Sequence, residues 1–135
     1  MSTPEEVVQE FCAAFAAKDV DTISRLLADD VVYHNVGMAP AVGKAASVAM
    51  IQGFLDMAEK MTFEIHRIAA NGDSVLTERT DTFTINGADS PVAVMGSFDL
   101  HGGLIVAWRD YFDMGLTTKM MSGEDIDAEL LPVIT

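Results

Sequence analysis

Two aspartates, Asp81 and Asp110, occupy positions at which a carboxylate could do chemistry. Each lies in an alternating segment typical of a strand, in which successive side chains point to opposite faces of a sheet. Asp110 shares its face with Trp108 and other apolar residues, and Asp81 shares its face with Arg79 and apolar residues. A carboxylate that faces a core is costly unless it is paired or hydrogen-bonded. The pattern is typical of an acid–base site inside an apolar pocket.

Arg79 supplies the cation that such a site needs. It lies two residues before Asp81, which places both side chains on one face, ~6.5–7 Å apart along the strand. Two carboxylates close together in a low-dielectric site cannot both ionise easily, so one pKa rises. A guanidinium that bonds both Asp81 and Asp110 keeps one of them ionised. The result is one carboxylic acid and one carboxylate, a pair suited to adding water across a strained bond.

Tyr33 and Asn35 form a second polar pair, two residues apart in a short extended segment, so they share a face. A phenol and an amide together offer donors and acceptors that could orient a water molecule toward a base. Taken alone, Tyr33 could equally be a rim tyrosine and Asn35 the residue that begins a turn.

Composition excludes several classes of protein. The chain has 8 basic and 21 acidic residues and a net charge of −13, which would repel nucleic acid and anionic membrane surfaces. No apolar run approaches the ~18 residues of a membrane span, and the N-terminus lacks the pattern of a signal segment. The single cysteine, Cys12, lies among apolar residues and is expected to be a buried hydrophobe. We expect one domain over residues 1–135 in a soluble, cytoplasmic protein.

The first half of the chain has helical periodicity. The segment Thr3-Pro4-Glu5-Glu6 matches a capping box with proline in the first turn, a typical start of a helix. The expected elements are a helix over residues 4–17, a short helix after Asp19 or Asp21, an extended segment over 31–35, an apolar loop over 36–43 and a helix over 44–60.

The second half alternates instead. The predicted strands cover residues 62–69, 73–85, 91–100 and 104–113, paired around Asn71-Gly72 and around residues 101–103. Helices followed by an antiparallel meander predict an α+β fold. We expect a curved, mostly antiparallel sheet wrapped over the N-terminal helices, forming a cone with an internal apolar pocket. The tail over residues 122–135 could be a lid or a fraying end.

Four apolar residues are the predicted substrate contacts: Trp108, Phe83, Phe112 and Met38. Further residues that could line the pocket or equally fill the core are Met50, Met57, Val94, Phe98 and Met114. The three histidines, His34, His66 and His101, share no spacing typical of a metal site. We therefore predict no metal site.

An ordinary cross-strand ion pair is the plainer interpretation of Arg79 and Asp81. An error of one residue in the alternation would turn Glu78 and Thr80 inward in their place. However, the alternate residues from Glu78 to Thr84 form a consistently polar row, which favours an inward Arg79 and Asp81.

Three motifs resemble those of the limonene-1,2-epoxide hydrolase family: Tyr33-x-Asn35, Arg79-x-Asp81 and Trp108-Arg109-Asp110. Each motif alone is weak, but the three in this order, on the expected faces, are fairly specific. The resemblance covers nearly the whole chain. It implies a ketosteroid-isomerase-like or SnoaL-like cone fold, a homodimer, and catalysis without a metal or organic cofactor.

The resemblance also implies a role for each polar residue. Asp110 would be the general base that deprotonates a water molecule held by Tyr33 and Asn35. Asp81, protonated, would donate to the epoxide oxygen as the ring opens, and Arg79 would bridge the two aspartates. The water would attack directly, in one step, and convert an apolar epoxide into a vicinal diol.

Two other functions stay open at this point. A ketosteroid-isomerase-like or polyketide-cyclase-like enzyme needs one carboxylate base beside donors to an enolate oxygen, which an arginine shared by two aspartates fits poorly. A non-catalytic ligand-binding or dimerisation module would leave both aspartates unexplained. Fold alone separates none of these. The loop over 36–43 and the tail match no family pattern, so the identity of the epoxide is not predicted.

Overall fold

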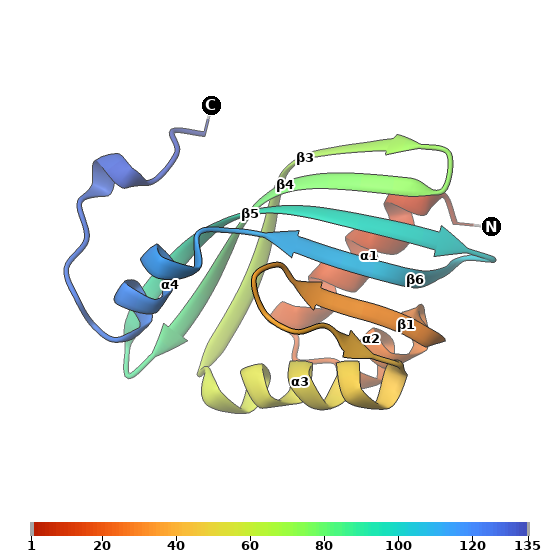
Figure 1. Cartoon of the computed structure of the whole chain (residues 1–135), viewed down its shortest axis with the longest axis horizontal. Coiled ribbons are helices and arrows are strands. Elements are labelled where there is room, and N and C mark those ends of the chain that lie inside the picture. Colours follow the sequence, from red (N-terminus) through yellow and green to blue (C-terminus); the bar gives the residue numbers. More distant parts are fainter. Residues whose placement is uncertain (1, 135) are drawn as a thin grey trace.

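One curved sheet of six strands organises the chain, and the computed structural model describes residues 2–134 (Figure 1). The strand order is β2-β1-β6-β5-β4-β3. Strands β1 and β6 pair in parallel, and all other neighbouring strands in this order pair antiparallel. The strands are β1 (Leu27–Asn35), β2 (Ala41–Val42), β3 (Lys60–Asn71), β4 (Ser74–Ile85), β5 (Ala88–His101) and β6 (Leu104–Tyr111).

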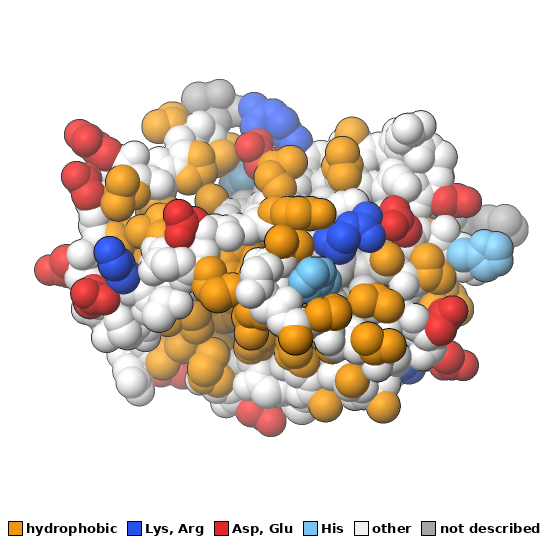
Figure 2. Space-filling view, in the orientation of Figure 1, with side chains coloured by type: hydrophobic (Ala, Val, Ile, Leu, Met, Phe, Trp, Pro, Cys, Tyr) orange, Lys and Arg blue, Asp and Glu red, His pale blue; other side chains and the backbone are white. Residues whose placement is uncertain are grey.

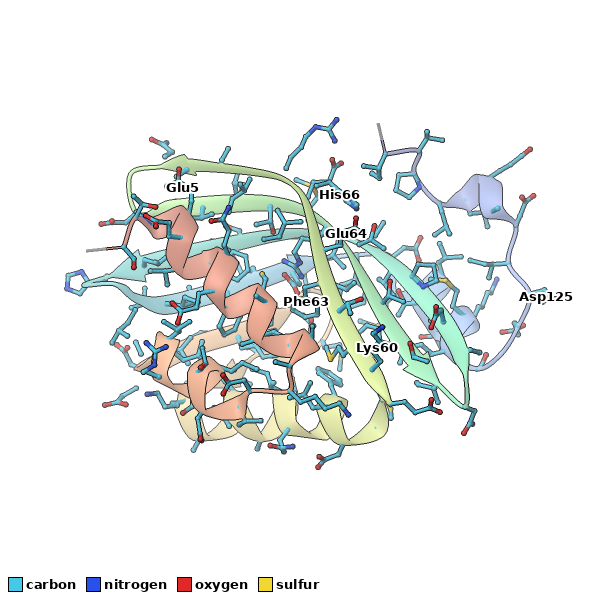
Figure 3. All side chains as sticks on the ribbon, turned by 180° about the vertical axis from the view of Figure 1, so that it is seen from behind. Glu5, Lys60, Phe63, Glu64, His66 and Asp125 are labelled. Atoms are coloured by element: carbon cyan, nitrogen blue, oxygen red, sulfur yellow. The ribbon has the colours of Figure 1, made fainter. Side chains whose placement is uncertain are left out.

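The helices lie mainly on the concave side of this sheet. The helical elements are α1 (Pro4–Ala16), α2 (Val20–Leu26), α3 (Lys44–Met57), α4 (Met114–Met121) and a 3₁₀ turn, η1 (Ala128–Leu130). Helix α1 crosses behind the sheet and packs on β3 and β4, and α3 packs on β1 and β2 (Figures 1 and 3). The capping box predicted at Thr3 and Glu6 is present, so two backbone N–H groups at the start of α1 are satisfied.

Irregular pairing curves the long strands. The register shifts between Ile65 and Arg67 in β3 and between Asp99 and Leu100 in β5. Such irregularities bend a strand and increase its local twist. The shift in β3 lies in the middle of the strand, and the shift in β5 lies close to its end. Figure 1 shows that the lower halves of β3, β4 and β5 turn away from the upper halves.

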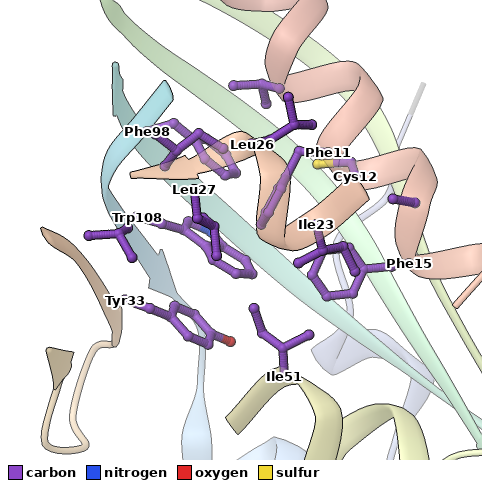
Figure 4. Close-up of a cluster of buried hydrophobic side chains, with 14 of the residues drawn as sticks. Phe11, Cys12, Phe15, Ile23, Leu26, Leu27, Tyr33, Ile51, Phe98 and Trp108 are labelled. Carbon is purple, nitrogen blue, oxygen red and sulfur yellow. The ribbon is translucent and has the colours of Figure 1, made fainter. Parts of the chain in front are cut away.

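Aromatic side chains fill the core between α1 and the sheet. The Trp108 indole stacks on the Tyr33 ring, with ring centroids 4.0 Å apart, and meets Phe11 edge-on at 5.0 Å (Figure 4). Phe15 also packs edge-on against Trp108. Cys12 is buried among these residues as expected, and burial raises the pKa of its thiol to about 12. The thiol is therefore a neutral core group at physiological pH.

The structure confirms the predicted fold class and most of the elements, with differences at their ends. Strand β1 begins at Leu27, earlier than the extended segment predicted over 31–35, and α3 ends at Met57, before the predicted end at residue 60. The apolar loop over 36–43 contains the short strand β2, which pairs with β1. Helix α4 and the turn at Asn86-Gly87 were not predicted; both turn residues have positive φ, as an Asn-Gly hairpin turn requires.

Within residues 2–134, each helix is either too short or too polar to cross a lipid bilayer.

Candidate active site

Arg79 joins the two aspartates in one buried ion-pair cluster. Its Nε and Nη2 donate to the two oxygens of Asp81 at 3.0 and 2.7 Å. Its Nη1 and Nη2 donate to the two oxygens of Asp110 at 3.2 and 2.8 Å. The three residues are only 1–4% exposed. The geometry is the bridge that the alternation of β4 and β6 suggested, with Nη2 shared between both carboxylates.

A glycine on the intervening strand makes this bridge possible. Arg79 lies on β4 and Asp110 on β6, and β5 runs between them. Gly96 of β5 pairs with Thr77 on one side and with Asp110 on the other. A Cβ atom at Gly96 would lie 2.2 Å from Arg79 Nη1 and 2.9 Å from Asp110 Oδ1. The guanidinium therefore crosses β5 through the space that the absent side chain leaves.

The two aspartates have unequal environments. Asp110 receives three donors, because Trp108 Nε1 adds a 2.8 Å bond to the two from Arg79. Among the hydrogen bonds that the structure shows, Asp81 receives two, both from Arg79. Burial raises the pKa of Asp81 to about 6, against the lowering effect of Arg79, and the charge of Asp110 raises it further. Asp81 is thus the carboxyl suited to hold a proton, and Asp110 is the one that accepts more hydrogen bonds.

Arg79 stays protonated and positively charged in this site. Burial alone would lower its pKa, but Asp110 and Asp81 raise it well above the ordinary value. The face of the guanidinium also lies over the Phe63 ring, with Cζ 4.8 Å from the ring centroid. When Asp81 holds a proton and Asp110 does not, the cluster of three residues has no net charge, which lowers the cost of burying it.

Tyr33 and Asn35 lie beside Asp110 because β1 runs parallel to β6. Asn35 pairs with Asp110, and Tyr33 pairs with Trp108. The Asn35 amide donates to the Tyr33 hydroxyl at 3.0 Å, and both side chains are buried. Burial raises the pKa of Tyr33, so its hydroxyl stays protonated. The two polar pairs predicted from separate parts of the sequence therefore meet in one place.

The two aspartates and the Tyr33–Asn35 pair open into a cavity of about 300 Å³ on the concave side of the sheet. Of the apolar residues expected there, the cavity is lined by Met38, Phe83, Val94, Phe112 and Met114. The volume is at the small end of the ~300–1,000 Å³ range of ligand sites. The polar groups of the site therefore face a mainly apolar space.

Trp108 lies elsewhere than predicted. It was expected to contact substrate, but it is fully buried, stacked on Tyr33, and stands behind Asp110. Its indole N–H orients the carboxylate instead of forming a wall of the cavity. Three of the residues that could line the cavity or fill the core do not line it: Phe98 is fully buried in the core, Met50 packs against the core, and Met57 is about half exposed.

Sequence reasoning missed two parts of the site. The first is Gly96, whose importance appears only when β4, β5 and β6 are set side by side. The second is α4, which lines the outer part of the cavity with Met114, Thr117, Thr118 and Met121. Their spacing of 0, 3, 4 and 7 positions is that of one helix face, and Asp113 caps the helix by accepting from Leu116 N–H. This spacing and cap were the available signals.

The histidines take part in other contacts. His34 Nε2 lies 2.8 Å from the carbonyl oxygen of Met38, and His66 Nε2 lies 2.8 Å from Thr80 Oγ1. Within residues 2–134, the His, Cys, Asp and Glu side chains form no group of three arranged to hold a metal ion.

Comparison with known proteins shows the family of this chain. The sequence pattern of the limonene-1,2-epoxide hydrolase catalytic domain matches residues 2–122. Epoxide hydrolase EphG of Mycobacterium tuberculosis is 39% identical over 109 residues, which cover 79% of this chain and 71% of that protein.

Solved structures agree. An epoxide hydrolase of this type from M. tuberculosis superposes with a TM-score of 0.74 at 37% identity, covering 86% of each chain. A protein from Catenulispora acidiphila with a ketosteroid-isomerase-like fold, solved with trimethylamine, has a TM-score of 0.78 at 21% identity; it covers 97% of this chain and all of that one. At that identity it shows the shared fold alone. The resemblance drawn from three short motifs is confirmed, and the chain belongs to the limonene-1,2-epoxide hydrolase family.

Proposed function

We propose that the protein hydrolyses an apolar epoxide to a vicinal diol in one step, without a covalent intermediate. The observation that carries the proposal is the single guanidinium shared by two unequal, buried carboxylates that both face an apolar cavity. Family membership supports epoxide hydrolysis as the reaction. The arrangement of the side chains supports direct attack by an activated water molecule.

Asp110 acts as the general base. Its Oδ1 already accepts from Trp108 and from Arg79, whereas its Oδ2 accepts from Arg79 alone. Oδ2 therefore keeps a lone pair for a water molecule. Tyr33 and Asn35 orient that water, which loses a proton to Asp110 while its oxygen bonds to an epoxide carbon.

Asp81 acts as the general acid. It donates its proton to the epoxide oxygen as the carbon–oxygen bond breaks, so the leaving alkoxide never carries a full charge. After the reaction Asp110 holds a proton and Asp81 is ionised. A proton then moves from Asp110 to Asp81, and Arg79 keeps the cluster neutral in both states.

The most direct test replaces each carboxylate by its amide. Asp110→Asn and Asp81→Asn should each abolish diol formation from a panel of apolar epoxides, because an amide neither accepts nor donates a carboxyl proton. Asp99→Asn is the matched control, since Asp99 pairs with Arg109 on the outer face of the sheet; its activity should stay within about twofold. Circular dichroism and Tm check the fold. Full activity in Asp110→Asn would contradict the mechanism, and turnover of a steroid enone without any action on epoxides would favour the isomerase alternative.

We propose that the protein is a homodimer formed through the outer face of the sheet. Val42, Leu76, Met95 and Tyr111 are 48–68% exposed there. Figure 2 shows hydrophobic side chains over the middle of this face and most acidic side chains toward its rim. That distribution would let two chains of charge −13 approach. Light scattering should give a dimer mass that falls to the monomer mass in Met95→Asp/Tyr111→Asp; a monomeric wild-type protein would contradict the dimer.

We further propose that the reaction needs no cofactor and takes place in the cytoplasm. The two aspartates, the arginine and a water molecule are chemically sufficient for the hydrolysis. The single buried thiol of Cys12 suits a reducing compartment. Full activity after dialysis against EDTA is the expected result, and activity restored only by an added metal ion would contradict it.

A further inference from the structure

The two ends of the cavity differ in polarity. At the closed end, Tyr33, Asn35, Asp81 and Asp110 are all buried. The outer part is lined by one face of α4, in which every residue keeps some exposed surface. Between the ends the lining is apolar. A substrate with its epoxide at the closed end therefore places its far end beside α4.

The polar groups that α4 contributes to the cavity lining are the hydroxyls of Thr117 and Thr118. Thr117 Oγ1 donates to the carbonyl oxygen of Asp113 at 2.8 Å, and Thr118 Oγ1 donates to that of Met114 at 2.8 Å. Each hydroxyl has one proton, and that proton is used within the helix. In this arrangement the lone pairs that remain are free to accept a hydrogen bond. The outer end of the cavity thus offers acceptors to a ligand.

Charge adds a second restriction. Within the described part of the chain, the residues that line the cavity include no lysine, arginine or histidine. Lys119, next along α4, lines a separate groove with Asp113, Asp125 and Asp127. An anionic group on the substrate would find no cation in the lining to pair with and would be repelled by the ionised carboxylate deeper in the cavity.

We propose that the substrate is a neutral epoxide with an apolar body and a hydrogen-bond donor, an alcohol group, at the end remote from the epoxide. Thr117 and Thr118 bind this alcohol and determine specificity. The inference rests on the proposed epoxide hydrolysis and narrows its substrate class.

Three synthetic epoxides test the inference. They share one terminal epoxide and one alkyl chain, and end in a methyl, a hydroxyl or a carboxylate group. For the wild-type protein kcat/KM should be highest for the hydroxyl compound, about 2- to 10-fold lower for the methyl compound, and lowest for the carboxylate. Equal values for the hydroxyl and methyl compounds, or fastest turnover of the carboxylate, would overturn the proposal.

Substitutions on α4 locate the effect. In the double variant Thr117→Val/Thr118→Val each new side chain has nearly the same shape as threonine but no hydroxyl. This variant should lose the preference for the hydroxyl compound over the methyl compound. Thr118→Lys should raise kcat/KM for the carboxylate compound at least about tenfold by supplying the missing cation. Ser122→Lys is the control: it adds the same charge just after α4, outside the cavity lining, and should leave the order of the three substrates unchanged.

The outcomes separate this inference from the proposed function. If none of the three epoxides is hydrolysed, the proposed function fails and the inference fails with it. If the methyl compound is hydrolysed but the valine variant keeps the wild-type preference, only the inference fails.

Discussion

The closed end of the cavity and its mouth are built in different ways. At the closed end, Arg79, Asp81 and Asp110 lie on central strands and are tied to one another by four hydrogen bonds from one guanidinium. At the mouth, α4 has no buried residue, and its hydroxyls bond within their own helix. The closed end is held by the sheet, whereas the mouth is held by a single short surface helix.

This difference assigns chemistry and specificity to different elements. Groups that move protons must keep their positions to a fraction of an ångström, and strands that pair on both sides provide this. A wall that contacts the rest of the substrate tolerates change. Substitutions at the closed end should therefore reduce kcat strongly, and substitutions at the mouth should alter KM and substrate preference.

Among variants that keep both aspartates, the largest effect is expected from Arg79→Lys. Lysine keeps the positive charge but cannot bond both oxygens of Asp81 and of Asp110 at once. We expect kcat to fall on the order of 100-fold or more, because both carboxylates lose their fixed positions. Steady-state kinetics measure this, with Arg109→Lys on the outer face as the control. A fall in kcat of less than about threefold would contradict the role of the Arg79 guanidinium as the bridge between the two aspartates.

Gly96→Ala should come next. The added methyl group would meet Arg79 Nη1, so the guanidinium must leave one carboxylate. We expect kcat to fall about 10- to 100-fold and the free energy of unfolding to fall by about 1–3 kcal/mol.

Two comparisons separate this effect from general damage. In an Arg79→Ala background, Gly96→Ala should cost less stability, because the nearest clashing atom is absent and only the milder contacts with Thr77 Oγ1 and Asp110 Oδ1 remain. Gly53→Ala, in α3 with open space around its Cβ, should stabilise the protein by about 0.5–1 kcal/mol. An equal stability cost of Gly96→Ala with and without Arg79 would show that the glycine serves another purpose.

The raised pKa of Asp81 predicts a pH dependence of both activity and stability. Activity requires protonated Asp81, so kcat/KM should decline at pH values above about 6.

Stability should depend on pH as well, because the native state binds this proton more tightly than the unfolded chain, whose aspartate pKa is near 3.8. The contribution of Asp81 to the free energy of unfolding is therefore complete below pH 3.8. It is lost as the pH rises to about 6, at roughly 1.4 kcal/mol per pH unit. Urea unfolding of wild type and Asp81→Asn should show this difference; parallel curves would contradict it.

The smallest effect is expected at the mouth. Met121→Ala shortens a partly exposed wall residue of α4. We expect KM to rise about 2- to 5-fold with little change in kcat, because such a contact contributes about 0.5–1 kcal/mol. A large fall in kcat would show that α4 takes part in the chemistry and would remove the contrast between the two ends.

The features that could be predicted from the sequence are those that depend on the local conformation of the chain. Alternation placed Arg79, Asp81 and Asp110 on the inner face because the side-chain period of a strand is two, and this holds without knowledge of its neighbours. Likewise, the pattern of helices followed by alternating segments was enough for the α+β class. The turn at Asn86-Gly87 carried a recognisable signal that was overlooked.

Features that depend on distant pairing could not be predicted in this way. The parallel pairing of β1 with β6 brings Asn35 beside Asp110, and no local pattern specifies it. The role of Gly96 follows from the register of three strands. Helix α4 packs few apolar side chains, so its periodicity is weak. Trp108 was assigned to the cavity because alternation gives the face of a side chain but not its depth.

In the proposed mechanism water, rather than an aspartate, attacks the epoxide. One turnover of excess enzyme in oxygen-18 water, followed by mass spectrometry of the diol, tests it directly. Direct attack predicts one labelled oxygen in the diol from the first turnover. An unlabelled first product, with the label found later on Asp81 or Asp110, would mean that the reaction proceeds through an aspartyl ester.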